Sequence, residues 1–252
     1  MKIHLMRFKA VVVLISFLVL ISACTPNNVQ NDPSIGKILD SAGMYGSFAI
    51  LDNGAEQFTI HNLSAYKDSA VAPLNTFYLV PTLLAVERGM MNQDSLSWIN
   101  FDSTVAYQNM IQHIGRPAIL KVIDSLHYGK GIVSADMTQF WTDNSLKITP
   151  DEQLGLIKKL YFDQLYFQKR SQDVVKKMIL KEDNASYKLS YIAGSSLDSN
   201  NQSWVLGYVE ENKHVYFFVL STKSLQADDL SNKNIAVLKQ ILLQQGFLKG
   251  RR

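Results

Sequence analysis

The chain has 252 residues, of which 47% are apolar and 19% charged, and this predicts one globular domain with a sizeable core and room for a sub-lobe. The formal net charge of +3 comes entirely from Lys2, Arg7 and Lys9, since removing these three from the 25 basic residues leaves 22, equal to the 22 acidic residues. Nothing in the charge of the remainder favours nucleic acid or an anionic partner.

The first 23 residues are predicted to be a secretory signal. Basic residues precede an apolar run from Ala10 to Ala23. Fourteen residues of helix would cover about 21 Å, which is short of the roughly 30 Å hydrocarbon core of a bilayer. The basic-then-apolar order therefore fits a cleaved signal better than a spanning helix.

The signal ends with Leu-Ile-Ser-Ala-Cys at residues 20–24, which resembles the lipobox of bacterial lipoproteins. The resemblance implies cleavage before Cys24, lipid attachment to it, and a membrane-anchored protein of the cell envelope; Thr25 offers no retention signal, which favours the outer membrane. Cys24 is the only cysteine, so no thiol remains for disulfides, metal clusters or catalysis. Residues 24–40 are predicted to be a tether and residues 41–252 the folded domain.

The domain is predicted to open with a β-hairpin. Strands are expected at Gly46–Asp52 and Gln57–Asn62, joined by a tight turn at Asn53-Gly54. A helix over Pro73–Gly89 follows, with apolar residues on most sides, so it should be buried nearly all round. Two further helical stretches lie within Asp102–Leu126, on either side of a break at Gly-Arg-Pro.

The second half is predicted to return from helices to strands. Thr149-Pro150-Asp151-Glu152 has the cap, proline and acidic residues of a helix start. The remaining expected elements are helices at 152–160 and 171–180, strands at 187–192, 203–210 and 215–222, and a last helix at 234–245. This order predicts an α+β fold with three α/β/α layers, in which both chain ends share one antiparallel sheet and helices form a sub-lobe.

Several segments resemble, in order, the motifs of the penicillin-recognising serine enzymes, above all the class D β-lactamases and the closest transpeptidase domains. Pro73–Gly89 is similar without a gap to the helix P-A-S-T-F-K-I-P-N-x-L-I-A-L-E-x-G that carries the nucleophile in class D enzymes. The other matching segments are Tyr107–Lys130, Phe140-Trp141, Leu146–Pro150, Tyr187–Gly194 and Trp204–Glu210. Together they span roughly residues 45 to 248 and imply this family's fold.

The same resemblance implies that the catalytic groups are missing. Family enzymes use the serine of S-x-x-K as acyl acceptor and its lysine as base, but Asn75 and Tyr78 stand at these positions. An amide is no nucleophile toward a lactam, and a phenol with a pKa of about 10 is no ready base at neutral pH. In place of the strand motif K-T-G stand Ile192, Ala193 and Gly194, of which only the glycine is retained.

Two further family positions match the sequence in other ways. The S-x-V motif matches Ser103-Thr104-Val105 as a string, whereas counting back from Tyr107 without a gap places Asp102 at the serine, and both readings stay open. The basic residue that binds the substrate carboxylate in the family corresponds loosely to Lys233.

Other candidate motifs are expected to be chance matches. Ser64 and Lys67 form a literal S-x-x-K, but they lie in a polar connection upstream of the apolar helix. Ser221-Thr222-Lys223-Ser224 lacks the glycine of K-T-G. The histidines have no metal-ligand spacing, so neither a metal nor another cofactor is predicted.

The sequence thus predicts a lipid-anchored, non-catalytic member of this fold that binds or scaffolds, with peptidoglycan or an envelope protein as partner. Loss of the nucleophile alone costs on the order of a millionfold in turnover in serine hydrolases. The old cleft is either filled, with the Tyr78 ring packed on Ile192, or open to a non-covalent ligand, and we favour the first. The alternative function is a divergent β-lactamase or peptidoglycan DD-peptidase whose nucleophile is Ser103, Ser195 or Ser196, which would need a basic partner.

Overall fold

The computed structural model describes residues 28–91, 103–131, 133–196, 201–225 and 230–251. Its centre is a seven-stranded sheet in the order β1-β3-β2-β9-β8-β7-β6, with every neighbouring pair antiparallel except β1 and β3. The strands are β1 (Val29–Asn31), β2 (Met44–Asp52), β3 (Gln57–His61), β6 (Leu180–Asp183), β7 (Lys188–Ser195), β8 (Gln202–Glu211) and β9 (His214–Ser224). Because β2 pairs with β9, the two ends of the chain share one sheet, as predicted.

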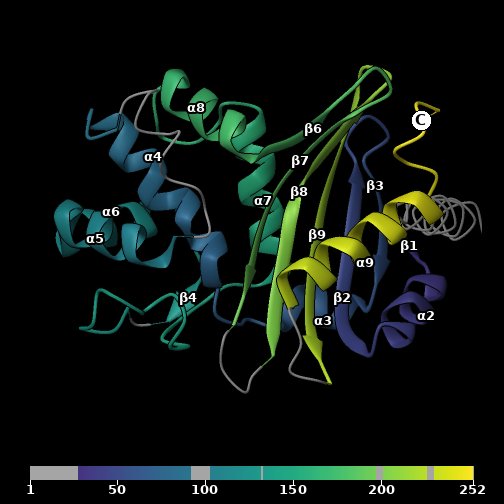
Figure 1. Cartoon of the computed structure of the whole chain (residues 1–252), viewed down its shortest axis with the longest axis horizontal. Coiled ribbons are helices and arrows are strands. Elements are labelled where there is room, and N and C mark those ends of the chain that lie inside the picture. The colour runs from purple at the N-terminus through teal and green to yellow at the C-terminus, as the bar shows by residue number, and fades with distance from the viewer. Residues whose placement is uncertain (1–27, 92–102, 132, 197–200, 226–229, 252) are drawn as a thin grey trace, which may run out of the picture.

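Helices cover both faces of this sheet and give the predicted three layers (Figure 1). On one face, α2 (Pro33–Ser41) and α9 (Leu230–Gln244) enclose an apolar core that includes Ile38, Phe218 and Leu238. The other face and the sub-lobe are formed by α3 (Leu63–Asp68), α4 (Leu79–Glu87), α5 (Thr104–Ile114), α6 (Arg116–Leu126), α7 (Pro150–Tyr161) and α8 (Lys169–Ile179). A two-stranded sheet, β4 (Lys130–Gly131) with β5 (Leu146–Lys147), lies beside the sub-lobe.

The apolar segment Pro73–Gly89 is a central helix with an irregular start. It begins as the 3₁₀-helix η1 (Leu74–Tyr78) and continues as α4. Every residue from Thr76 to Val86 is buried, which confirms the prediction of a helix enclosed on all sides. Pro81 is the third residue of α4, where a missing N–H leaves no helical hydrogen bond broken.

The predicted start of α7 is confirmed in detail. The Thr149 hydroxyl accepts from the Glu152 N–H at 3.2 Å, and the Glu152 carboxylate accepts from the Thr149 N–H at 2.8 Å. This reciprocal capping box satisfies two amides that the helix cannot pair internally. It also fixes where α7 begins, and so where its buried side chains lie.

The described part of the predicted tether, residues 28–40, is folded into the domain. β1 pairs with β3, and α2 packs Ile35, Ile38 and Leu39 into the core. Asp32 caps α2 through the Ser34 N–H at 2.8 Å, with a proline at the first helical position. The domain boundary at residue 41 is therefore too late. The signal, Cys24 and residues 24–27 lie outside the described residues.

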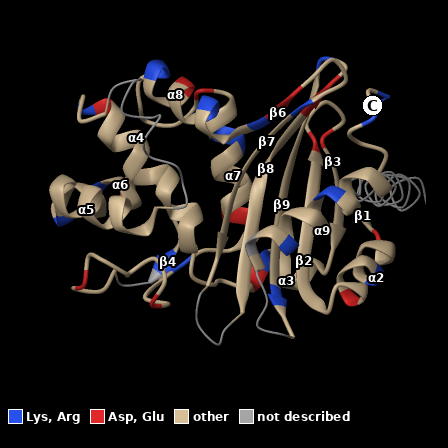
Figure 2. Ribbon diagram, in the orientation of Figure 1, with Lys and Arg blue, Asp and Glu red and all other residues tan. Residues whose placement is uncertain are grey.

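Charges of both signs lie close together on the surface. On α8 and the adjoining loop, Lys169 and Lys176 each pair with Asp163 and Asp173, and Figure 2 shows both signs there. Lys67 of the literal S-x-x-K is about half exposed and pairs with Asp151 at 3.0 Å. Among the helices of the described ranges, none has the length and apolar character to cross a bilayer.

Candidate ligand-binding cleft

A cleft of about 580 Å³ opens at the start of η1. Its walls come from η1, the first turns of α5, the loop 138–143 and the end of β7. Apart from Trp141 and Asp143 they carry only amides and hydroxyls: Asn75, Thr104, Gln108, Thr138, Gln139, Thr142, Ser195 and Ser196. No lysine, arginine or histidine belongs to this described lining.

The chain entering η1 is held by hydrogen bonds from two directions. The Ala72 carbonyl accepts from the Gln202 Nε2 and the Trp204 Nε1 of β8, each at 2.9 Å. The Leu74 N–H donates to the Trp141 carbonyl at 2.9 Å. Leu74 has a φ of 53°, a left-handed conformation that costs a residue with a side chain on the order of 1–3 kcal/mol. These bonds therefore hold a strained turn just before Asn75.

Gly194 allows η1 to approach β7 closely. A Cβ at this position would lie 2.8 Å from the Asn75 backbone nitrogen and 3.1 Å from that of Thr76, distances too short for carbon. In the sequence, Gly194 is the one residue of the strand motif that the resemblance retains, and there a glycine would let a ligand approach the strand. In the structure, the atoms that approach are those of η1 itself.

Tyr78 is fully buried in an aromatic cluster. Its ring stacks on Tyr107 with centroids 3.8 Å apart and meets the edge of Trp141 at 5.8 Å. Burial raises the pKa of the phenol, and this outweighs the opposite effect of Thr104 and Trp141 beside the hydroxyl. The hydroxyl makes no hydrogen bond of normal geometry within the described structure. Tyr78 is thus a neutral core residue at neutral pH, not a base.

Asn75 differs from Tyr78 because it lines the cleft and is partly exposed. Its side-chain amide makes no hydrogen bond to the described protein, so its donor and acceptor remain available to a ligand. The two expectations for the cleft therefore each hold in part. The Tyr78 ring packs against Tyr107 and Trp141 and fills the space around its own position. The space in front of Asn75, in contrast, stays open.

Ile192 and Ala193, which stand at the first two positions of the strand motif, point away from the cleft. Ile192 is 1% exposed and belongs to the core between the sheet and α4. Ala193 points to the opposite face and packs on the core beneath α2 and α9. Neither lines the cleft, and Lys233 does not line it either.

Within the described lining of the cleft, the alternative serine nucleophiles have no lysine or histidine beside them. Ser195 and Ser196 line the cleft, but its described lining has no lysine or histidine. The Ser196 hydroxyl donates to the Gln202 carbonyl at 3.3 Å and accepts from its N–H at 2.8 Å. Ser103 stands at the cap position of α5 and is not part of the lining, and Asp102 lies outside the described residues.

Sequence reasoning missed a buried polar cluster behind η1. Gln153 of α7 is 0% exposed and donates from Nε2 to the Thr76 hydroxyl at 2.8 Å, and that hydroxyl donates to the Pro73 carbonyl. The Gln153 Oε1 and the buried Tyr128 hydroxyl make no hydrogen bond to described atoms. The available signal was a glutamine on the buried stripe of α7, between Pro150 and Ile157 at helical spacing. Gln153 joins α7 to η1.

No metal centre is evident in the described part of the chain, where no three histidine, cysteine or acidic side chains converge.

Comparisons with known proteins agree on the family of folds. No protein-family model matches the sequence. The chain is 26% identical over 219 residues to β-lactamase OXA-48 of Klebsiella pneumoniae, covering 78% of this chain and 82% of that protein. It is also 26% identical over 204 residues to the regulatory protein BlaR1 of Bacillus licheniformis, covering 72% of this chain and 34% of that protein.

Solved structures give the same result. The class D β-lactamase YbXI from Nostoc superposes with a TM-score of 0.78 at 25% identity, covering 85% of this chain and 99% of that one. The C-terminal domain of the Bacillus licheniformis BlaR penicillin-receptor superposes with a TM-score of 0.80 at 24% identity, covering 88% and 98%. The chain belongs to the β-lactamase/transpeptidase-like superfamily.

Proposed function

We propose that this protein is a lipid-anchored binding module of the bacterial cell envelope that has the β-lactamase/transpeptidase-like fold without its catalysis. One observation carries the proposal: the cleft at Asn75 is open, and its described lining has no lysine or histidine to activate a serine. Asn75 presents an amide to the cleft. One helical turn further along the chain, Tyr78 carries a buried, neutral phenol.

The cleft lining also indicates the kind of ligand. Amides and hydroxyls donate and accept hydrogen bonds but attract no net charge, and Asp143 adds only a negative one. A ligand that depends on a cation to hold its carboxylate is therefore disfavoured. Neutral groups such as the sugar hydroxyls and peptide amides of peptidoglycan, or the backbone of a partner protein, suit this lining better.

Exposure to a labelled penicillin tests the absence of catalysis. We expect intact-protein mass spectrometry to find no adduct after prolonged incubation. The Asn75→Ser variant should also stay unmodified, because a serine hydroxyl beside Tyr78 still lacks a base. An adduct on the natural protein, located to any serine, would contradict the proposal.

Binding to purified cell wall tests the role of the cleft. We expect sedimentation with insoluble peptidoglycan, and loss of it in Ser195→Trp, which fills the cleft. Ser125→Trp, on the exposed side of α6, is the matched control and should bind normally. Equal binding by both variants would place any interaction elsewhere on the surface.

Lipid attachment is tested at Cys24. We expect the protein to incorporate labelled palmitate and to fractionate with membranes, and Cys24→Ser to lose both properties. Thr25→Ser serves as the control. Palmitate on the Cys24→Ser protein would contradict the assignment.

The alternative function, a serine β-lactamase or DD-peptidase with a relocated nucleophile, rests on Ser195 and Ser196 in the cleft wall. It predicts hydrolysis of a chromogenic cephalosporin or release of a terminal D-amino acid, abolished in Ser195→Ala or Ser196→Ala. Turnover that survives in both variants would rule out these serines.

A further inference from the structure

One end of the seven-stranded sheet brings together the start and the end of the described chain. The Asn28 side chain donates to the Glu56 carbonyl at 3.2 Å, in the turn between β2 and β3. The Asn212 side chain, in the turn between β8 and β9, donates to the Gly250 carbonyl at 3.1 Å. These turns lie at the upper end of the sheet in Figure 1, with the C-terminus beside them. We call this surface the turn end, and it consists of Asn28, the turns 53–56, 184–187 and 212–213, and the segment 246–251.

The turn end lies close to the proposed lipid anchor along the chain. Only residues 25–27 separate Cys24 from Asn28, and four Cα–Cα steps of a fully extended chain span at most about 14 Å. The Asn28 carbonyl accepts from the Phe58 N–H at 2.7 Å, so the pairing of β1 with β3 starts directly at this point. A lipid on Cys24 therefore keeps Asn28 within that distance of the bilayer surface.

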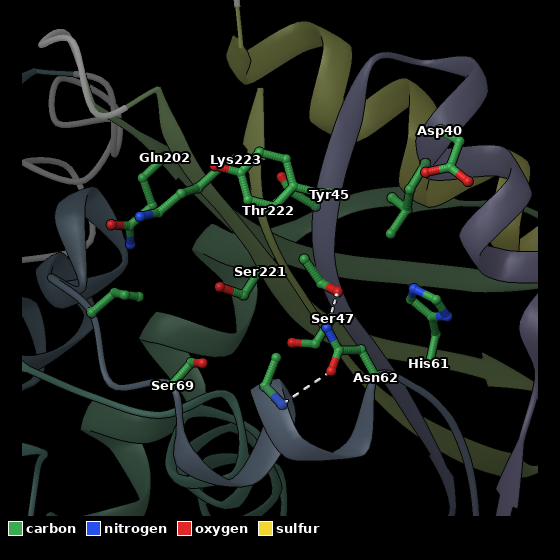
Figure 3. Close-up of a pocket in the computed structure, with 14 residues that line it drawn as sticks. Asp40, Tyr45, Ser47, His61, Asn62, Ser69, Gln202, Ser221, Thr222 and Lys223 are labelled. Carbon is green, nitrogen blue, oxygen red and sulfur yellow. Dashed lines mark hydrogen bonds between the residues drawn. The ribbon is translucent and has the colours of Figure 1, made fainter. Parts of the chain in front are cut away.

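The cleft at Asn75 lies at the opposite end of the sheet. Ser195, at the end of β7, lines the cleft and pairs with Ser203 of β8, whereas β8 reaches the turn end at Asn212. Nine residue steps of antiparallel strand, at about 3.4 Å each, place the cleft about 30 Å from the turn end. A second pocket, of about 330 Å³ between β2, β9 and α3, also lies at the end away from the turns, with Ser221 in its lining (Figure 3).

Three exposed basic residues belong to the turn end. Lys213 is in the turn between β8 and β9, and Lys249 and Arg251 are in the C-terminal segment. None of the three makes an ion pair with a residue that the structure describes. Their charges are therefore available to the phosphates of lipid headgroups, which attract lysine and arginine near the surface. The exposed Glu56 is the acidic residue that opposes them on this surface.

Other carboxylates near the turn end are engaged within the protein. Glu211 is 1% exposed and accepts from the Arg251 N–H at 2.7 Å. Protein donors also bond to Asp52, Glu182, Asp183 and Glu210. The edge formed by β1 and α2 is the other surface within reach of Cys24, and it exposes Lys37 and Asp40, which have opposite charges. Exposed cations without a described partner are thus more numerous at the turn end than at this edge.

We propose that the turn end rests against the bilayer that carries the lipid anchor and holds the cleft about 30 Å away from it. The inference rests on lipid attachment at Cys24, which is part of the proposed function. The short link to Asn28 limits how far the domain moves from the bilayer. The three cations favour the turn end over the edge at α2, because lipid phosphates attract them. Contact with headgroups at this surface leaves the cleft free to bind its ligand on the side away from the bilayer.

Introduced cysteines measure this orientation, because the only natural cysteine, Cys24, carries the proposed lipid. A donor dye is attached to one exposed position at a time on the lipidated chain, in vesicles that contain anionic lipid and an acceptor dye. The positions are Ala55→Cys in the turn end, Ser41→Cys at the last residue of α2, and Ala135→Cys in the loop that leads to the cleft. We expect strong energy transfer from Ala55→Cys and loss of most of it at the other two positions.

Every other pattern overturns the proposal. Equally strong transfer from Ala55→Cys and Ser41→Cys would place the edge of β1 and α2 on the bilayer. The strongest transfer from Ala135→Cys would place the cleft there, and equal transfer from all three would mean that the domain has no fixed orientation. Mass spectrometry first establishes the lipid on Cys24. A chain without it contradicts the proposed function as well, whereas a lipidated chain with another pattern contradicts only the orientation.

Lengthening the link tests its role. A flexible Gly-Ser linker of about 20 residues, inserted after Thr25, has a root-mean-square span of roughly 25 Å. We expect it to abolish the preference for Ala55→Cys, because the domain can then turn freely above the bilayer. The same linker added after Arg252 is the control and should leave the preference unchanged. A preference that survives the inserted linker would contradict the proposal.

Neutralising the cations tests their role in the same assay. The variant with Lys213→Gln, Lys249→Gln and Arg251→Gln should lose the difference in transfer between Ala55→Cys and Ser41→Cys. The matched control replaces two lysines and one arginine that are exposed on α6 and α8, namely Lys121→Gln, Arg170→Gln and Lys177→Gln, and should keep the difference. Thermal melts establish that both variants are folded. Retention of the difference by the first variant, or its loss in both, would overturn the proposal.

Discussion

The residues that hold η1 in place, here called its supports, differ from the side chains that η1 itself carries in how they contact the rest of the protein. The supports are Ala72, Gln153, Gly194, Gln202 and Trp204, which hold the helix through hydrogen bonds and close backbone contact. The Asn75 side chain has no hydrogen bond to the described protein, and the Tyr78 ring only packs. The position of η1 is therefore fixed more firmly than the side chains of Asn75 and Tyr78 that it carries.

The largest effect is expected at alkaline pH, because several phenols are buried in the core. Burial raises the pKa of Tyr78, Tyr107 and Tyr128 above 10.0, and that of Tyr208 to about 12. The unfolded chain ionises first, so their contribution is complete below pH 10 and is lost as pH rises through the higher folded values. Phenolate absorbance against pH should include a late class that titrates with unfolding. A single class at the ordinary pKa in the folded protein would contradict this.

Tyr78→Ala should be the most damaging single substitution. Removing a large buried aromatic side chain costs about 3–5 kcal/mol, because a cavity remains against Tyr107 and Trp141. Tyr166→Ala, at an 84% exposed position, should stay within about 0.5 kcal/mol. Urea unfolding measures both. Equal stability of the two variants would mean that Tyr78 is not part of the core.

Substitutions at two glycines should have opposite signs. Gly194→Ala should destabilise by about 1–3 kcal/mol, since its Cβ would strike the backbone of η1. Gly155→Ala, in the middle of α7 with nothing within 4 Å of the new carbon, should stabilise by about 0.5–1 kcal/mol. Thermal melts distinguish the two. A neutral Gly194→Ala would show that η1 can move away from β7.

The two donors to the Ala72 carbonyl should be coupled. Gln202→Leu or Trp204→Phe alone leaves this buried acceptor one partner, whereas the double variant leaves it none. We expect the double variant to lose about 0.5–1.5 kcal/mol more than the sum of the single losses. A double-mutant cycle by chemical denaturation measures the difference. Strict additivity would mean that the carbonyl finds another donor.

The smallest effect is expected at Asn75. Asn75→Ala should change the free energy of unfolding by no more than about 0.5 kcal/mol, because the side chain is partly exposed and unbonded. Its consequence should be confined to ligand binding in the cleft. A loss comparable to that of Tyr78→Ala would place Asn75 among the supports.

Sequence patterns within a few helical turns predicted several helices, whereas the shape of the cleft depends on contacts between residues far apart in the sequence. The capping box at Thr149 and the apolar run from Pro73 are complete within a few turns, so the sequence alone identifies them. The helix at Pro33–Ser41 was missed because a polar, turn-rich stretch precedes it, although Asp32 and Pro33 are themselves a helix start. The open space at Asn75 depends on how η1, loop 138–143 and β7 pack, which no local pattern specifies.

Two tryptophan side chains pack around η1, so the intrinsic fluorescence of the protein reports on this region. Trp141 lines the cleft while almost fully buried, and Trp204 donates to the carbonyl just ahead of η1. Of the three tryptophans, only Trp98 lies outside the described residues. Occupation of the cleft should therefore alter the emission of Trp141 directly, so intrinsic fluorescence can follow ligands there without a label. Trp141→Phe and Trp204→Phe would separate the two signals.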